Sequence, residues 1–262
     1  MTSNAGRPAV LIFAGVDPSG GAGIAADILA VSSQGAHALP VVSALTVQDN
    51  DRVFEVAPVK AELVARQAQA LIDKGIAIGA VKIGIPGNAA NARAIADVIL
   101  ALRRGNPDLP VVLDPVLSSG HGDALSRDDA VKALTPLLVL ATLVVPNSVE
   151  ARRLTGVDGA AKQAARLHAS GCRHVLITGG HDGGEAVLNR WFGADGEQQD
   201  WSWPRLPGGF HGSGCTLASA IAARLAQGQP MALALAGAQS YCQHALADAY
   251  PIAGGQLMPR RV

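Results

Sequence analysis

Residues 9–27 have the sequence AVLIFAGVDPSGGAGIAAD, which contains the three parts of a βα unit in order. Residues 9–15 are a continuous apolar run, turn residues follow, and a helical spacing of apolar residues begins at Ile24. A strand that is apolar on both sides is typical of a parallel sheet covered by helices on both faces. This stretch therefore predicts an α/β fold.

The same alternation of short apolar runs and longer Ala-rich segments continues along the chain and predicts more βα units. The expected strands are residues 9–15, 39–47, 80–84, 111–114, 143–145 and 174–178. Residues 186–203 differ, because two aromatic-rich runs flank a turn at 193–196, which predicts a β-hairpin. We expect residues 1–6 to be a mobile tail and residues 7–262 to form one domain around a mainly parallel sheet.

Composition excludes several classes of protein. The 21 Lys and Arg balance the 21 Asp and Glu, and no block of like charge occurs, so we expect no nucleic-acid partner. The strongest apolar stretch, residues 134–145, is too short to span a membrane and contains Pro136, and no signal peptide is evident. Three widely spaced cysteines form no CxxC pair, which indicates a reducing compartment and predicts a cytoplasmic protein.

A second glycine-rich turn, HGSGCT at residues 211–216, opens a helix and could bind an anion through backbone N–H groups. No P-loop lysine motif exists in the chain. The structural alternative is a flexible loop in which Ser213 or Thr216 caps the helix. Cys215 falls on the first turn, where a thiol pKa tends to fall, although most such cysteines are buried and inert.

Oxygen ligands follow two expected strands. Asn147 and Glu150 stand three residues apart at the start of a helix, an arrangement that suits a hydrated Mg²⁺ but also matches a capping box. Asp114 ends another strand, where it is either a ligand or a turn former.

Near the amino end, the GxGxxG spacing of dinucleotide-binding proteins is absent after the first strand, and Asp17 or Ser19 could cap the following helix. Gln48 follows the second strand. Its carboxamide can accept a hydrogen bond from an exocyclic amine while it donates one to a ring nitrogen.

In order, the segments AGVDPSGGAGIAAD, SALTVQ, VKIG, VVLDPV, VVPNSVE, VLITGGH and HGSGCTLASA resemble those of hydroxymethylpyrimidine/phosphomethylpyrimidine kinases, within the ribokinase-like superfamily. The resemblance runs from about residue 10 to 226. It implies a single ribokinase-like α/β domain, ATP and Mg²⁺ as cofactors, and a homodimer. It also implies phosphorylation of 4-amino-5-hydroxymethyl-2-methylpyrimidine and then of its monophosphate, in thiamine biosynthesis.

The resemblance assigns roles to ten residues. Gly212, Ser213 and Gly214 match the anion hole, and Cys215 takes the catalytic position at which ribokinase itself has an aspartate. Asp114, Asn147 and Glu150 match the nucleotide and Mg²⁺ region, with Asn147 and Glu150 holding the metal partly through water. The pyrimidine pocket is matched by Gly15, Asp27 and Gln48.

The chain also departs from the family pattern. Thr178 stands where enterobacterial members have lysine, which removes a candidate cation near the γ-phosphate and bears on the second phosphorylation. Asp49, Asn50 and Ile85 are further departures beside the pocket, and residues 254–262 are only loosely similar. Two other functions remain open: a pyridoxal kinase, against which Gln48 favours an aminopyrimidine, and a non-catalytic ligand-binding regulator on the same fold.

Overall fold

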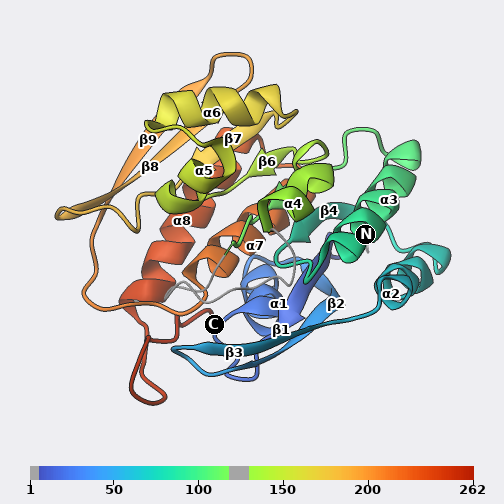
Figure 1. Ribbon diagram of the computed structural model, residues 1–262, viewed down its shortest axis with the longest axis horizontal. Coiled ribbons are helices and arrows are strands. Elements are labelled where there is room, and N and C mark those ends of the chain that lie inside the picture. The colour runs from blue at the N-terminus through green and yellow to red at the C-terminus, as the bar shows by residue number, and fades with distance from the viewer. Residues whose placement is uncertain (1–5, 118–129) are drawn as a thin grey trace, which may run out of the picture.

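The computed structural model describes residues 6–117 and 130–262, where the strands form one nine-stranded sheet in the order β3-β2-β1-β4-β5-β6-β7-β8-β9 (Figure 1). The strands are β1 (Ala9–Val16), β2 (His37–Gln48), β3 (Val53–Pro58), β4 (Ile78–Ile83), β5 (Val111–Leu113), β6 (Leu143–Val144), β7 (His174–Ile177), β8 (Ala186–Gly193) and β9 (Gln198–Pro204). Strands β2, β1, β4, β5, β6 and β7 pair in parallel, and β3, β8 and β9 add antiparallel pairs at the two edges. The expected mainly parallel sheet and the β8–β9 hairpin are confirmed. The tail predicted for residues 1–6 lies outside the described residues except for Gly6.

Helices cover both faces of the sheet, as the apolar strands predict. One layer holds α1 (Gly23–Ser33), α7 (Ser213–Ala226) and α8 (Met231–Ala247); the other holds α2 (Ala61–Asp73), α3 (Ala89–Gly105), α4 (Ala130–Leu138), α5 (Ser148–Thr155) and α6 (Ala160–Ala169). Alternate residues of β1 serve the two layers: Leu11 and Phe13 pack with α2 and α3, and Val10 and Ile12 pack with α1 and α7. Burial of aliphatic side chains on both faces therefore stabilises the sheet.

Strand β3 was not predicted from the sequence. Phe54 and Glu55 are both exposed on this edge strand, so the residues of β3 lack the alternation that marks a half-buried strand. Among the described residues, no helix combines the length and the apolar character needed to cross a bilayer.

The topology gathers the ends of five parallel strands at one edge. The chain passes from β1 to its neighbour β2 and then returns to β4 on the other side of β1. In such sheets a crevice forms beyond the carboxyl ends of the strands where the order reverses, and ligands bind there. Asp17, Gly84, Asp114, Asn147 and Thr178 follow β1, β4, β5, β6 and β7, so they share this edge.

Candidate active site

Two glycine-rich turns pack against each other at this edge. Gly23 and Gly212 have φ angles of +57° and +73°, which favour glycine. A Cβ atom at Gly23 would overlap the carbonyl oxygen of Gly15, and one at Gly212 would overlap that of Gly21. The turn before α7 therefore approaches the turn after β1 this closely only because residues 21 and 212 are glycine, and Gly23 permits the tight bend within the turn after β1.

The start of α7 has free backbone donors. Gly212 is the N-cap and no side chain caps the helix, so the alternative in which Ser213 or Thr216 acts as the cap is wrong. The Thr216 hydroxyl instead donates to the Gly212 carbonyl over 2.8 Å. Within the described part of the chain, the N–H groups of residues 212–215 donate to no other residue. Because the helix dipole adds positive potential here, this terminus can bind an anion.

Cys215 lies in the first turn of α7, close enough to Asp114 for the charge of that carboxylate to act on its thiol. Burial raises the pKa of the Cys215 thiol to about 12, and the charges of Asp27 and Asp114 add to this effect, whereas Lys82 opposes it. The expected fall in the pKa is therefore wrong for the unliganded protein, because burial and two carboxylates outweigh Lys82. Taken over all its atoms, Cys215 is half-buried, and the alternative of an inert cysteine stays open.

Asp114 and Glu150 form an acidic pair at the ends of β5 and β6. They are 5% and 8% exposed. Burial raises the pKa of Asp114 to about 6, and burial together with the charge of Asp114 raises that of Glu150 to about 8. Asn147 and Glu150 do form the capping box: Glu150 N donates to Asn147 Oδ1 over 2.9 Å, and Asn147 N donates to Glu150 Oε2 over 3.0 Å.

The acidic pair fits a divalent cation. Asp114 Oδ2 is buried and has no hydrogen-bond partner among the described residues, and the raised pKa of Glu150 indicates uncompensated negative charge. No group of three His, Cys, Asp or Glu in residues 6–117 and 130–262 could hold a metal by itself. Mg²⁺ keeps several water ligands and needs few protein groups, so Asp114, Asn147 and Glu150 suit it.

A buried ion pair, which the sequence did not reveal, lies beneath these residues. Lys82 Nζ and Asp27 Oδ1 are 2.8 Å apart with both side chains fully buried, and Ser219 Oγ also donates to Asp27. Burial alone would lower the pKa of Lys82, but Asp27, Cys215 and Asp114 raise it, so Lys82 stays cationic. Asp27 is 0% exposed, so its carboxylate lies in the interior next to Lys82, and its place in the pyrimidine pocket stays a prediction. One feature of the sequence could have indicated this ion pair: Lys82 is the one charged residue in the otherwise apolar strand β4.

Gln48 and Gly15 lie at the β1 side of the edge. Gln48 is half-buried, and its Nε2 donates to Thr46 Oγ1 over 2.8 Å, which leaves its Oε1 without a partner in the described residues. A Cβ atom at Gly15 would meet the side chain of Ile85, 2.7 Å from its Cδ1. The departure at Ile85 therefore lies directly against Gly15.

Asp17 and His211 connect the two glycine-rich turns. His211 Nε2 and Asp17 Oδ2 are 2.8 Å apart, and the same carboxylate accepts from the N–H groups of Ser19 and Ala22. Burial alone would raise the pKa of Asp17, but these hydrogen bonds outweigh it and hold the pKa below its usual value. The N-cap residue of α1 is Ala22, so the expectation that Asp17 or Ser19 is the N-cap is wrong, although the Asp17 carboxylate accepts from Ala22 N.

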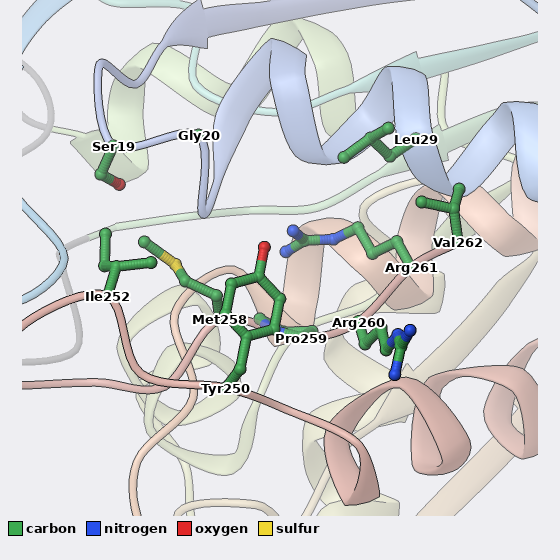
Figure 2. A pocket seen from close by; sticks show the side chains of 10 residues that line it. All are labelled: Ser19, Gly20, Leu29, Tyr250, Ile252, Met258, Pro259, Arg260, Arg261 and Val262. Carbon is green, nitrogen blue, oxygen red and sulfur yellow. The ribbon is translucent and has the colours of Figure 1, made fainter.

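A hollow of about 220 Å³ adjoins the site on the far side of the Ser19–Gly20 turn. Figure 2 shows it between that turn, α1 and the C-terminal segment. Its lining contains none of the residues predicted from the sequence to form the active site.

Free donors for an anion and buried oxygen ligands for a cation, at one edge of a doubly covered parallel sheet, define a phosphotransferase of the ribokinase-like class. The family model for phosphomethylpyrimidine kinase matches residues 17–259, and the chain belongs to this family.

Individual proteins agree with this assignment. The hydroxymethylpyrimidine/phosphomethylpyrimidine kinase of Streptomyces coelicolor is 38% identical over 256 residues, which are 95% of this chain and 92% of that protein. The pyridoxal kinase of Bacillus subtilis, solved as an ADP complex, is 26% identical with a TM-score of 0.86 and 98% of each chain covered. The phosphomethylpyrimidine kinase of Clostridium difficile 630 is 28% identical with a TM-score of 0.76, covering 90% of this chain and 98% of that one. The ribokinase-like fold is confirmed.

Proposed function

We propose that the protein transfers the γ-phosphoryl group of ATP to the hydroxymethyl oxygen of 4-amino-5-hydroxymethyl-2-methylpyrimidine, and then phosphorylates the monophosphate. The observation that carries this proposal is the uncapped N-terminus of α7, which lies next to the Asp114–Glu150 pair. The family and the names of its members support the pyrimidine as the acceptor.

In this reaction the bond from Pγ to the bridging oxygen of ATP breaks, and a bond from the substrate oxygen to Pγ forms as the hydroxyl loses its proton. The N–H groups of residues 212–215 bind the phosphate oxygens and stabilise the charge that spreads over them in the loose transition state. Cys215 orients the substrate hydroxyl and takes part in removing its proton. Because burial raises the pKa of the Cys215 thiol to about 12, only a small fraction is thiolate near neutral pH, and that fraction accepts the proton of the hydroxyl, so we expect a modest contribution to the rate.

Asp114, Asn147 and Glu150 would hold Mg²⁺, Asn147 and Glu150 partly through water. The ion supplies positive charge that offsets the negative charge of the phosphates. The capping box fixes the Glu150 carboxylate in place before any ligand binds, because its Oε2 accepts from Asn147 N. Thr178 pairs with Asn147 in an isolated β-bridge, so it lies beside the proposed Mg²⁺ ligands. Enterobacterial members of the family have lysine at this position, and threonine supplies no positive charge there.

Gln48 would recognise the amino group and ring nitrogen of the pyrimidine through its carboxamide. The missing side chain at Gly15 leaves room for Ile85, which would then form the wall of the proposed pocket at this position. Asp27 acts indirectly. Its carboxylate holds Lys82 in place near Cys215 and Asp114.

Mass-resolved products from the purified protein, ATP, Mg²⁺ and the pyrimidine test the function. We expect a monophosphate followed by a diphosphate. A monophosphate alone would limit the protein to the first step, and ligand binding without ADP release would favour the non-catalytic regulator.

Pyridoxal phosphorylation is the second candidate function, because the Bacillus subtilis pyridoxal kinase covers 98% of the chain with a TM-score of 0.86. ADP release measured in parallel with the pyrimidine, with pyridoxal and with no acceptor separates the two activities. We expect the pyrimidine to give the higher kcat/KM, and faster turnover of pyridoxal would reverse the assignment.

A cytoplasmic homodimer is the assembly that we propose. Leu45, Val47 and Phe54 are 54%, 56% and 68% exposed on the neighbouring strands β2 and β3, an apolar edge that a second copy could cover (Figure 1). Light scattering tests this state: we expect twice the mass of the chain, and Phe54→Glu should shift it toward the monomer.

A further inference from the structure

Arg261, the residue before the last, is buried behind the anion-binding turn, with 4% of its surface exposed. Its Nε donates to Thr216 Oγ1 over 2.9 Å, and one terminal nitrogen contacts the carbonyl oxygens of Gly21, His211 and Gly212. A single guanidinium therefore joins the turn after β1 to the turn before α7. In Figure 2 it is directed inward below Gly20, whereas the side chain of Arg260 points away.

These contacts orient backbone donors. In a trans peptide group the C=O and the N–H of the next residue point in opposite directions. A guanidinium that holds the carbonyls of His211 and Gly212 therefore directs the N–H groups of Gly212 and Ser213 away from itself. Those two groups are among the free donors at the start of α7.

The charge of Arg261 also favours an anion at this site. Within the described residues its guanidinium makes no ion pair and donates only to neutral oxygens, although Asp27 is close enough to raise its pKa. Burial lowers its pKa, yet an arginine side chain remains protonated in proteins. A buried cation that forms no direct ion pair within the described residues, and that lies behind the N-terminus of α7, raises the potential at the place where phosphate would bind.

The C-terminal segment fixes the position of Arg261 through backbone hydrogen bonds. Arg260 N donates to Ala245 O on α8 over 2.8 Å, and the Tyr241 hydroxyl donates to Arg261 O over 3.0 Å. Further along the segment, His211 N donates to Leu257 O over 2.9 Å. Because the segment is anchored on α8 and on the turn itself, the side chain of Arg261 has little freedom to leave its place.

We propose that Arg261 is a positioning residue of the nucleotide site, which holds the peptide groups of the two glycine-rich turns so that the donors of α7 face the phosphates. This inference rests on the proposed function for the identity of the ligand. It assigns a role to the part of the chain that least resembles the family.

The test compares Arg261→Ala and Arg261→Lys with the wild type, and uses Arg260→Ala as the matched control. Calorimetry gives the Kd of ADP, and initial rates give kcat and the KM values for ATP and for the pyrimidine. For Arg261→Ala we expect the ADP Kd and the ATP KM to rise by about 10- to 100-fold, the scale of losses caused by misplaced binding groups, with the pyrimidine KM nearly unchanged. Arg261→Lys should recover part of the loss, because it keeps the charge but cannot contact all four oxygens. Arg260→Ala should match the wild type.

Guanidinium ion at millimolar concentration should restore part of the ADP affinity to Arg261→Ala and none to Arg260→Ala. Thermal unfolding guards against a variant that fails to fold; if Arg261→Ala is unfolded, Arg261→Lys decides the question. A folded variant at position 261 with wild-type ADP affinity and ATP KM would overturn the proposal, and so would equal losses in both KM values. Because ADP binding is measured without an acceptor, the outcome for Arg261 stands even if the pyrimidine proves to be the wrong substrate.

Discussion

Two helix N-termini meet at the same edge of the sheet, and they are prepared for opposite charges. At the start of α7 a glycine occupies the N-cap, and the N–H groups of residues 212–215 have no acceptor within residues 6–117 and 130–262. At the start of α5 the capping box of Asn147 and Glu150 satisfies the terminus with its own carboxylate. The first end can bind an anion, and the second presents negative charge to a cation. In the function that we propose, the capping of each helix therefore decides which charge its N-terminus binds.

Substitution of Gly214 should have the largest effect on anion binding at α7. This residue is exposed and its φ angle is not positive, so it can accept a side chain without backbone strain. A Cβ atom there would lie 3.7 Å from both carboxylate oxygens of Asp114, which is an ordinary contact. We therefore expect Gly214→Val to fold but to block the phosphates, with kinase activity nearly abolished. Gly105→Val, at the open end of α3, is the matched control and should keep full activity. Wild-type turnover in Gly214→Val would show that phosphate binds elsewhere.

Cys215 lies between the N-terminus of α7 and the acidic pair of Asp114 and Glu150, so its substitution tests whether proton transfer takes place between these two regions. Cys215→Ala should lower kcat by about 10²-fold, the low end of general-base effects, with ATP binding largely kept. Cys215→Asp should retain more activity than Cys215→Ala if proton transfer is part of the role. Rates measured from mildly acidic to mildly basic pH check this. If alanine at position 215 turns over as fast as cysteine throughout, the thiol only fills space.

The cationic side of the comparison depends on the charge of Glu150. Glu150→Gln preserves an acceptor for Asn147 N but removes the negative charge, so the Mg²⁺ concentration for half-maximal activity should rise by about 10- to 100-fold. Thermal unfolding without Mg²⁺ should change little, because glutamine keeps the acceptor for Asn147 N and removes a carboxyl group whose charged form is disfavoured by burial and by Asp114. Glu62→Gln, on the exposed first turn of α2, is the control. An unaltered Mg²⁺ dependence would remove Glu150 from the metal site.

Gln48 belongs to neither helix end, so its loss should affect the acceptor alone. One of its N–H groups already donates to Thr46. We therefore expect Gln48→Ala to cost about 1 kcal/mol, the low end for a carboxamide contact with a base edge, or roughly fivefold in the KM for the pyrimidine. Steady-state kinetics with both substrates varied check this, with Gln69→Ala on α2 as the control. An effect confined to ATP would place Gln48 in the other pocket.

The smallest expected effect is a change in acid stability at Asp17, which links the α7 turn to the turn after β1. Its pKa is lowered in the folded protein, so on acidification the unfolded state takes up this proton first. The stability contributed by Asp17 is thus present above its ordinary pKa of 3.8 and is lost as the pH falls through the folded value. Asp17→Asn should lose less stability than the wild type between about pH 5 and pH 3. Denaturant unfolding measures this, with the surface variant Asp73→Asn as the control, and equal losses in Asp17→Asn and the wild type would contradict the assignment.

Local sequence patterns predicted the elements that neighbouring residues determine. The parallel strands, the hairpin, the glycine-rich start of α7 and the Asn147–Glu150 spacing are all of this kind. The contacts that were missed join distant residues: Lys82 with Asp27, His211 with Asp17, and Arg261 with Gly21, which are 55, 194 and 240 positions apart. No local periodicity reports such pairs, because only the closed fold brings them together.

The pKa of Cys215 gives a second reason for the limits of sequence. Its place on the first turn of a helix predicts a low pKa, but burial among Asp27 and Asp114 raises it to about 12. The helix end is visible in the sequence, whereas the burial is a property of the assembled core.

A crystal structure of the protein with Mg²⁺ and a non-hydrolysable ATP analogue tests the opposite roles of the two helix ends most directly. The account predicts phosphate oxygens within hydrogen-bonding distance of the N–H groups of residues 212–215, with the metal on the side of Asp114 and Glu150. Phosphates bound away from the start of α7, or a metal with no direct or water-mediated contact to Glu150, would contradict it.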